Sequence, residues 1–211
     1  MGKTGERILL MKEYIIKKVP GTTPVWSEAE EVLVDTYPWG CPFEEAPQVA
    51  AMLQLTDQGL HVLMACDETD PRATYTENND PVCRDSCLEC FLSAGDGGYL
   101  NFECNANGAI WSAFGPDRHH RQFLRDLSLP EPKVTVHKSP VGWGVEYCIP
   151  QEVFTALYGH PLKAGDTFCA NFYKCGDDTA VPHYAVWNPV VAEAPDYHRP
   201  ECFGMVKIEG E

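Results

Sequence analysis

Two glutamates, Glu89 and Glu103, have the clearest capacity for chemistry in this sequence. Each lies in a segment that alternates polar with apolar residues, 85–93 and 99–105. The polar positions of these segments also hold one aspartate and two asparagines, namely Asp85, Asn101 and Asn105. Carboxylates and amides together donate and accept hydrogen bonds, as a site for a ligand with many hydroxyl groups requires. If the two glutamates lie on neighbouring strands, they could instead form the carboxylate pair of a glycoside hydrolase.

A third alternating segment, 167–174, places Asn171 and Tyr173 opposite its apolar residues. Side chains alternate faces along a β-strand, so each of the three segments predicts one core face and one polar face. Asparagine and aspartate are depleted in strands, and their use here is unfavourable for strand formation. We therefore interpret the polar face as a ligand-binding surface, with an ordinary solvated face as the alternative.

Two tryptophans could supply the flat apolar surface on which a sugar ring packs. Trp39 and Trp187 both lie in stretches flanked by loop residues, and for each of them a binding platform and a core position are equally consistent with the sequence. The remaining tryptophans lie in or beside apolar alternation and are expected in the core; they are Trp26, Trp111 and Trp143.

Three cysteines, Cys83, Cys87 and Cys90, have a spacing that can hold an iron–sulfur cluster. A strand through 85–93 would place Cys87 and Cys90 on opposite faces, and no alternating strand–helix pattern follows, so we do not expect a cluster. Ten cysteines without a visible export signal indicate reduced thiols and a cytoplasmic location.

Other metal-binding patterns carry less weight. The adjacent His119 and His120 cannot easily bind one ion together, and the remaining candidates of this kind are His183 and His198. The acidic stretches 67–70 and 177–178 offer oxygen ligands for a structural Ca²⁺, although such runs are more often solvated turns. No other cofactor is expected.

Many short strands must position these residues. Alternation and turn residues predict strands over 12–19, 29–35, 49–56, 60–66, 85–93, 98–105, 109–114, 133–138, 142–149, 166–174 and 203–209. One helix is predicted over 150–158, with Pro150 near its start and Gly159 at its end. The fold class is therefore all-β, an antiparallel β-sandwich of jelly-roll type with one short helix. No linker divides the chain, so we expect one domain over 12–211 after an N-terminal extension, residues 1–11.

The charge balance limits the partners. Thirty-one acidic and sixteen basic residues give a formal net charge of −15, which repels nucleic acid and anionic membrane surfaces. No apolar run approaches the roughly 20 residues that span a bilayer. The sequence does not reveal the oligomeric state.

Several stretches taken in order resemble the family 9-like carbohydrate-binding modules, a group of DOMON-type β-sandwiches. They are 84–91 (RDSCLECF), 99–105 (YLNFECN) followed by Gly108, 143–150 (WGVEYCIP), 170–174 (ANFYK), 183–187 with its histidine, tyrosine and tryptophan, and 197–200 (YHRP) leading to 203–204. The set spans nearly the whole chain after Trp26. Unlike secreted members attached to a glycanase, this chain shows no signal and many cysteines, which makes a mono- or oligosaccharide a more fitting ligand than a polysaccharide.

The resemblance implies a sugar clamped by two aromatic residues, frequently a structural Ca²⁺, and no catalysis. Arg84 and Glu89 would bond to hydroxyls beside Asn101, Asn171 and Lys174, and Trp187 or Trp39 would stack. The full set of candidate ligand-binding residues is Arg84, Asp85, Glu89, Asn101, Glu103, Asn105, Asn171, Tyr173, Lys174, His183, Trp187 and Trp39. The rival functions are a glycoside hydrolase that uses Glu89 and Glu103, and a protein-interaction domain that uses the same face.

Overall fold

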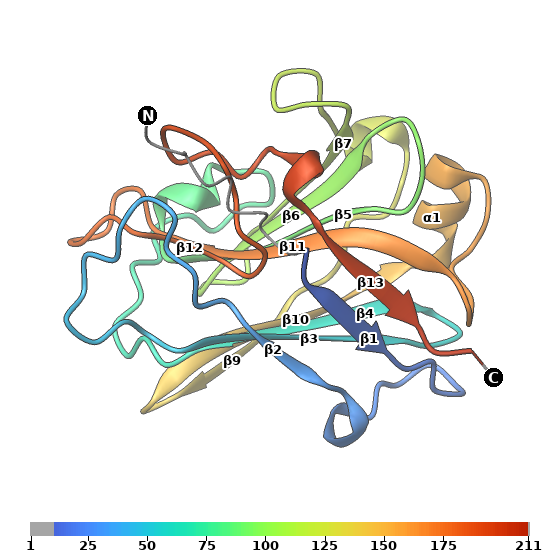
Figure 1. The fold of residues 1–211 in the computed structure, drawn as a ribbon, viewed down its shortest axis with the longest axis horizontal. Helices are drawn as coiled ribbons and strands as arrows, with labels where there is room; N and C mark the ends of the chain where they lie inside the picture. The colour runs from blue at the N-terminus through green and yellow to red at the C-terminus, as the bar shows by residue number, and fades with distance from the viewer. Residues whose placement is uncertain (1–10, 211) are drawn as a thin grey trace, which may run out of the picture.

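The protein consists of two β-sheets stacked face to face (Figure 1). The structure is a computed structural model, and it describes residues 11–210. The larger sheet has eight strands, in the order β1-β13-β11-β5-β6-β7-β8, with β12 paired to β11. The smaller sheet has five, in the order β2-β3-β4-β10-β9. The predicted all-β sandwich with one short helix is confirmed. The predicted extension, residues 1–11, lies outside the described residues except for Met11.

The strands follow the predicted alternation closely. Those of the larger sheet are β1 (Glu13–Ile16), β5 (Cys87–Ser93), β6 (Tyr99–Asn105), β7 (Ile110–Gly115), β8 (Gln122–Phe123), β11 (Thr167–Cys175), β12 (Tyr184–Val186) and β13 (Gly204–Ile208). Those of the smaller sheet are β2 (Glu31–Leu33), β3 (Val49–Leu55), β4 (Gly59–Cys66), β9 (Thr135–Ser139) and β10 (Gly142–Pro150). The helix α1 (Gln151–Tyr158) ends at Gly159, and four short 3₁₀ turns, η1 (Trp26–Glu28), η2 (Val82–Arg84), η3 (Leu124–Leu127) and η4 (Pro200–Cys202), complete the described elements.

The structure differs from the prediction at the edges of the larger sheet. The two shortest strands of this sheet, β8 and β12, have too few residues to show alternation, so the sequence did not indicate them. The first strand, β1, pairs in parallel with β13, whereas the other strand pairs are antiparallel. Within the described residues, no helix has the length and apolar character to cross a membrane.

The main core lies between the two sheets, where apolar side chains from both inner faces meet. The larger sheet contributes Leu88, Cys90, Leu92, Leu100, Phe102, Cys104, Phe168, Ala170 and Phe172, which are the apolar sets that alternation predicts. The smaller sheet contributes Ala51, Leu53, Leu60, Val62, Val145 and Ile149. The strands β5, β6 and β11 therefore turn their polar sets away from the sandwich interior.

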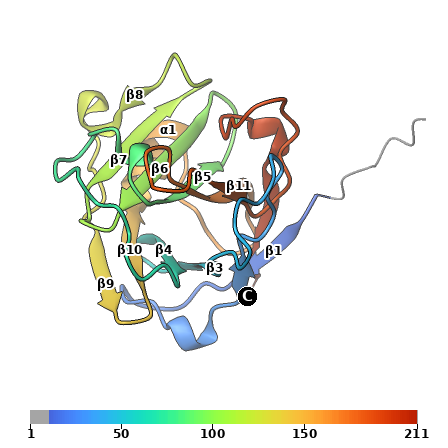
Figure 2. The same ribbon diagram turned by 90° about the vertical axis from the view of Figure 1, so that its left-hand side faces the viewer.

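A second apolar cluster covers the outer face of the larger sheet. The segment 187–203 folds back over this face, and its Val190, Tyr197 and Phe203 pack against Phe91 and Tyr173 of the strands. Figure 2 shows the loops that lie against β5, β6 and β11 on the side away from the smaller sheet. The polar face is consequently covered by loops, and the part that they leave open is a cavity.

Candidate ligand-binding site

Four side chains form a row across the outer face of the larger sheet. The register pairs Tyr173 of β11 with Glu89 of β5, Glu89 with Glu103 of β6, and Glu103 with Trp111 of β7. Directly opposed residues of antiparallel strands project from the same face, with Cβ atoms about 4.5–5.5 Å apart. The two glutamates thus lie side by side at the centre of the sheet, with an aromatic residue on either side.

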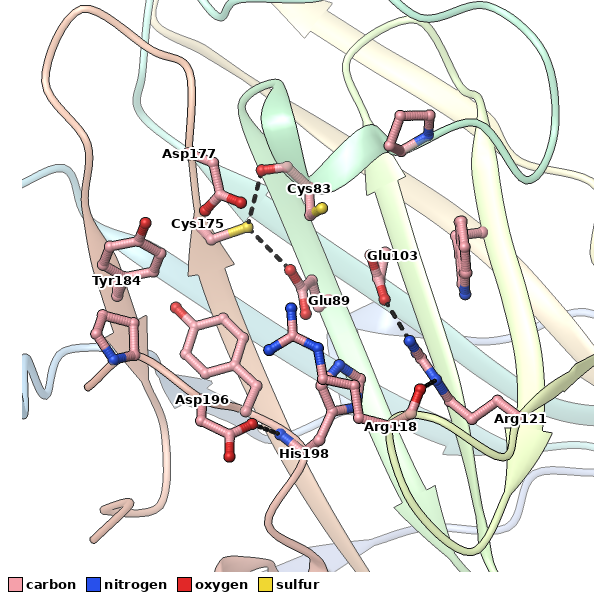
Figure 3. Close-up of a pocket in the computed structure, with 14 residues that line it drawn as sticks. Cys83, Glu89, Glu103, Arg118, Arg121, Cys175, Asp177, Tyr184, Asp196 and His198 are labelled. Carbon is pink, nitrogen blue, oxygen red and sulfur yellow. Dashed lines mark hydrogen bonds and ion pairs between the residues drawn. The ribbon is translucent and has the colours of Figure 1, made fainter. Parts of the chain in front are cut away.

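A cavity of about 300 Å³ lies above this row (Figure 3). The loop between β7 and β8 contributes Arg118 and Arg121, and the covering segment contributes Asp196, Tyr197 and His198. The remaining lining residues are Pro81, Cys83, Glu89, Glu103, Trp111, Cys175, Asp177, Tyr184 and Pro195. The strands therefore supply the floor, while loops distant in sequence supply most of the walls.

Glu103 is bound to a cationic network. Asn101 donates a hydrogen bond from Nδ2 to Oε1 of Glu103 at 2.7 Å. Arg121 donates from Nη1 to Oδ1 of the same asparagine at 2.9 Å, and that nitrogen lies 3.6 Å from Oε1 of Glu103. Burial raises the pKa of Glu103 to about 7, although the charges of Arg121 and Arg118 oppose the shift.

The surroundings of Glu89 favour its protonated, neutral form over the carboxylate. Its side chain is almost completely buried, and the thiol of Cys175 donates a hydrogen bond to Oε1 at 2.9 Å. Burial, followed by the charge of Glu103, raises the pKa of Glu89 well above its usual range. At neutral pH the pair therefore presents both a hydroxyl donor and carboxylate acceptors to the cavity, which is the combination that hydroxyl groups of a ligand require.

Aromatic side chains form two opposite walls of the cavity. The indole of Trp111 packs edge-on against Phe123, with centroids 4.7 Å apart, and its Nε1 is buried without a hydrogen-bond partner among the described residues. On the other side, Tyr197 stacks on Tyr173 with centroids 4.0 Å apart, and Tyr184 stands beside it. These walls offer flat apolar surfaces to the cavity.

His198 stands at the rim as a neutral group. Its Nδ1 is joined to the hydroxyl of Tyr99 by a hydrogen bond of 2.7 Å, and its ring packs on Phe91. Burial and the nearby arginines lower the pKa of His198 to about 3. The imidazole is therefore uncharged at neutral pH and positions the covering segment over the sheet.

The structure brings four of the predicted site residues to the cavity or directly beneath it. Glu89 and Glu103 line it, Asn101 supports Glu103 and Arg121, and Tyr173 supports Tyr197. The eight other predicted residues lie elsewhere, and most of them hold loops in place.

Three of those eight anchor loops with polar side chains. The carboxylate of Asp85 accepts hydrogen bonds from the backbone nitrogens of residues 74 and 75 and from Asn105 Nδ2, which fixes the loop before η2. Asn171 donates to the backbone oxygen of Asn188 at 2.9 Å and accepts from its nitrogen at 2.8 Å. The amides of Asn105 and Asn171 thus bond to the protein's own backbone.

Three charged or titratable candidates lie at the end of the sandwich. Arg84 is exposed and pairs with Asp178 at 2.9 Å. Lys174 is buried, and its Nζ lies 2.7 Å from His183 Nε2 and 3.4 Å from Glu68 Oε2. None of these three side chains lines the cavity between Trp111 and Tyr184.

The two tryptophans expected to stack do not form one clamp. Trp187 lies in the main core against Tyr14 and Phe172, and a Cβ atom added at Gly204 would lie 2.5 Å from its ring. Trp39 is half-buried, donates from Nε1 to the backbone oxygen of Ala192 at 3.0 Å, and packs edge-on against Tyr184. Trp39 therefore buttresses one cavity wall from behind.

Sequence reasoning missed the residues that build the walls. Trp111 was expected in the core, yet it lines the cavity. The tight turn at 106–109 places Trp111 opposite Glu103, and applying this hairpin register would have identified it. Arg118 and Arg121 lie in a loop, where no local pattern indicated them. Tyr184 and His198 lie in stretches that carry the family resemblance, but they were not assigned to the site.

Several groups could be considered as metal ligands. Oxygens of Glu68 accept hydrogen bonds from Ser86 and Trp143, and Asp178 is paired with Arg84. His119 and His120 are exposed, and only His120 bonds to Asp117 through its ring. The potential ligand atoms of Cys87, Glu89 and Cys175, in contrast, all lie within 4.8 Å of one another beneath the cavity.

Comparison with known proteins assigns this fold to a recognised group. Residues 26–208 match the profile of carbohydrate-binding family 9. A search of curated proteins returned no match. Among solved structures, the chain is similar to a protein from Bacteroides uniformis that carries a provisional carbohydrate-binding assignment, with 27% identity, a TM-score of 0.79, and coverage of 95% of this chain and 100% of that one.

Two further structures share the fold at lower identity. Both are family 9 carbohydrate-binding modules from Caldicellulosiruptor kristjanssonii. The complex with glucose has 16% identity, a TM-score of 0.67, and coverage of 95% of this chain and 97% of that one. The complex with cellotriose has 17% identity, a TM-score of 0.67 and coverage of 95% of both chains.

Proposed function

The chain belongs to carbohydrate-binding family 9, a family of non-catalytic binding modules, and we propose that it binds a mono- or oligosaccharide in the cavity above Glu89 and Glu103. The observation that carries this proposal is the pairing of two buried carboxyl groups with an aromatic wall on either side. Carboxyl groups hold hydroxyls by hydrogen bonds, and aromatic faces pack on the C–H faces of a sugar ring. The arrangement provides both in one enclosed space.

The size of the cavity favours a small ligand. Its volume of about 300 Å³ lies at the lower end of the range typical of small-molecule sites, roughly 300–1,000 Å³. That space suits about one sugar ring, with a longer oligosaccharide extending beyond the rim. The family 9 modules from Caldicellulosiruptor kristjanssonii have been solved in complex with glucose and with cellotriose. These two sugars are therefore the first ligands to test.

Calorimetric titration of the folded protein with glucose, cellotriose and a panel of other mono- and disaccharides tests the proposal. We expect saturable heat for at least one sugar and a change in tryptophan fluorescence, because Trp111 lines the cavity. The variant Glu103→Gln should weaken binding at least tenfold, about 1.4 kcal/mol, since hydrogen bonds to charged groups contribute about 1.5–3 kcal/mol.

The matched control is Glu146→Gln on the other sheet. That glutamate also accepts two side-chain hydrogen bonds, from Trp26 and His137, yet it lies outside the cavity. Its substitution should leave the affinity unchanged. No response to any sugar at millimolar concentration, from protein that is folded by circular dichroism, would count against sugar binding.

One observation favours glycoside hydrolysis as a second candidate. Glu89 and Glu103 are directly opposed on neighbouring strands, with Cβ atoms about 4.5–5.5 Å apart, and the carboxyl groups of a retaining glycosidase are about 5–5.5 Å apart. We propose binding without cleavage because the family consists of binding modules. Incubation with aryl glycosides and cellotriose should therefore give no product. Turnover that disappears in both Glu89→Gln and Glu103→Gln would establish the enzyme instead.

The cysteines and the charge suggest where the protein acts and what it avoids. All ten cysteines are free thiols. We therefore propose a reducing compartment such as the cytoplasm, and mass spectrometry after alkylation of freshly lysed cells should find ten alkylated thiols. The net charge of −15 argues against nucleic acid and anionic membranes as partners.

A further inference from the structure

Two cysteines and one glutamate converge beneath the cavity. Cys87 and Glu89 project from the same face of β5, and Cys175 at the end of β11 is the direct cross-strand partner of Cys87. Their sulfur and oxygen atoms all lie within 4.8 Å of one another, and none of the three residues is more than 3% exposed. Figure 3 shows the thiol of Cys175 directed toward Glu89, with Cys83 on the same side of the cavity.

We propose that Cys87, Cys175 and Glu89 bind one zinc ion, with the fourth coordination position open to the cavity. This site goes beyond the sugar proposal and shares Glu89 with it, since zinc binding would replace the proton that makes Glu89 a hydroxyl donor. The sequence analysis rejected an iron–sulfur cluster at Cys83, Cys87 and Cys90 because a strand separates Cys87 from Cys90, and Cys90 lies in the main core. The structure replaces it with Cys175 from a segment more than eighty residues away in the chain.

The geometry is close to that of a tetrahedral zinc site. Zinc binds sulfur at about 2.3 Å and carboxylate oxygen at about 2.0–2.2 Å, so tetrahedral ligand atoms lie roughly 3.3–3.8 Å apart. The ligand atoms of Cys87, Glu89 and Cys175 are at most 4.8 Å from one another, and Cys175 Sγ lies 2.9 Å from Glu89 Oε1. Side-chain shifts of about an ångström would therefore bring all three into coordination. The ligands stand on paired central strands, which hold their backbones in place.

The donor set favours zinc over Ca²⁺ and Mg²⁺. Two thiolates are soft ligands that suit zinc, whereas Ca²⁺ and Mg²⁺ take oxygen ligands. Binding releases three protons, one from each thiol and one from the carboxyl group of Glu89. The two thiolates and the carboxylate carry three negative charges and the zinc ion carries two positive charges, so the occupied site has one net negative charge. Because Glu89 and Cys175 also line the cavity, a ligand atom can reach the fourth position from the cavity side.

Cobalt substitution tests the site directly. Protein treated with a chelator, desalted and kept reduced under anaerobic conditions is titrated with Zn²⁺ or Co²⁺. We expect one zinc ion per chain by elemental analysis. We also expect a near-ultraviolet sulfur-to-cobalt charge-transfer band, with the intense visible bands of tetrahedral cobalt. Cys87→Ser and Cys175→Ser should each abolish the charge-transfer band or reduce it strongly. Each should also lower zinc affinity by at least about tenfold, since even outer-shell changes cost 10–100-fold.

The matched controls are Cys90→Ser and Cys104→Ser. These thiols are as buried as the proposed ligands and stand on β5 and β6, but they face the main core. They should keep the band even if they lower the melting temperature. Absence of zinc and of the band in folded, reduced wild-type protein would overturn the proposal. A band that survives in the variant lacking both Cys87 and Cys175 would overturn it as well.

The zinc and sugar proposals can fail separately. Sugar binding measured on the metal-free protein does not depend on the ion. Zinc binding measured in Trp111→Ala does not depend on the aromatic wall. Loss of one response with retention of the other therefore identifies which proposal is wrong.

Discussion

Replacement of Trp111 by alanine distinguishes the observed cavity from the arrangement that the sequence suggested. Trp111 forms one wall of the cavity, its indole rests against Phe123, and Arg121 lies over its ring at 5.6 Å. Alanine would remove the flat surface while leaving Glu89 and Glu103 in place. The proposed function therefore predicts weaker sugar binding in a protein that remains folded.

The size of the effect follows from the apolar area that is lost. If one face of a sugar ring covers roughly 60 Å² of the indole, its burial contributes about 1.5 kcal/mol at about 25 cal/mol per Å². The loss of this contribution raises Kd by about tenfold.

Isothermal titration calorimetry measures this change, with circular dichroism to confirm folding. The control is Trp26→Ala, because Trp26 is also half-buried but lies outside the cavity, with its Nε1 bonded to Glu146 of the other sheet. Its Kd should stay within about twofold of the wild-type value, as a residue outside the site predicts. A Trp111→Ala variant that is folded and binds as tightly as wild type would refute the cavity as the binding site.

Three further predictions concern stability. The pKa of His198 is about 3 in the folded protein against an ordinary value of about 6.5, so the unfolded chain takes up a proton that the folded protein does not. The stability present above pH 6.5 is therefore lost as the pH falls toward 3, by about 1.4 kcal/mol per pH unit from this group. Urea unfolding across pH should show a shallower acid dependence in His198→Gln, and an unchanged slope would contradict this assignment. The other titratable and charged groups that act on this imidazole are Tyr99, Arg118, Arg121 and His119. Gly204→Ala should destabilise the fold by about 1–3 kcal/mol, because the added Cβ would lie 2.5 Å from the ring of Trp187. Gly210→Ala, which meets nothing within 4 Å, should leave the melting temperature unchanged. Asn171→Ala should cost about 1–3 kcal/mol in urea unfolding, because it leaves the buried backbone groups of residue 188 without partners; full stability in that variant would show that the segment is held by other contacts.

Alternation along single strands was sufficient to predict the two faces of the larger sheet. In β5 and β6, for example, Cys90 and Phe102 lie in the main core while Glu89 and Glu103 project outward, as period-two spacing requires. This success depends only on local geometry, because a strand cannot turn two successive side chains to the same face. The same reasoning separated Cys87 from Cys90 and excluded the cluster that their spacing suggested.

Local geometry could not predict what covers the outer face. The segment 187–203 reaches it only through tertiary contacts, such as the bonds between Asn171 and Asn188, and periodicity carries no record of such contacts. The unfavourable use of asparagine and aspartate in these strands therefore did indicate a specific role, but for most of them that role is to hold loops and not to bind a ligand. Asp85, Asn105 and Asn171 bond to loop backbones, whereas only the carboxyl pair reaches the cavity.

The cavity floor comes from strands and most of its walls come from loops, and this difference affects how ligand preference is determined. The hydrogen-bonding floor is fixed by the register of β5 with β6, and changing it would disturb the centre of the sheet. The walls carry Arg118, Tyr184 and His198, which come from loops and a three-residue strand, and loops tolerate substitution better than paired strands do. Differences in sugar preference among proteins that share this sandwich should therefore arise in the loops after β7 and around β12. Polar strand residues such as Asn171, which hold those loops in position, should affect the affinity for every sugar alike.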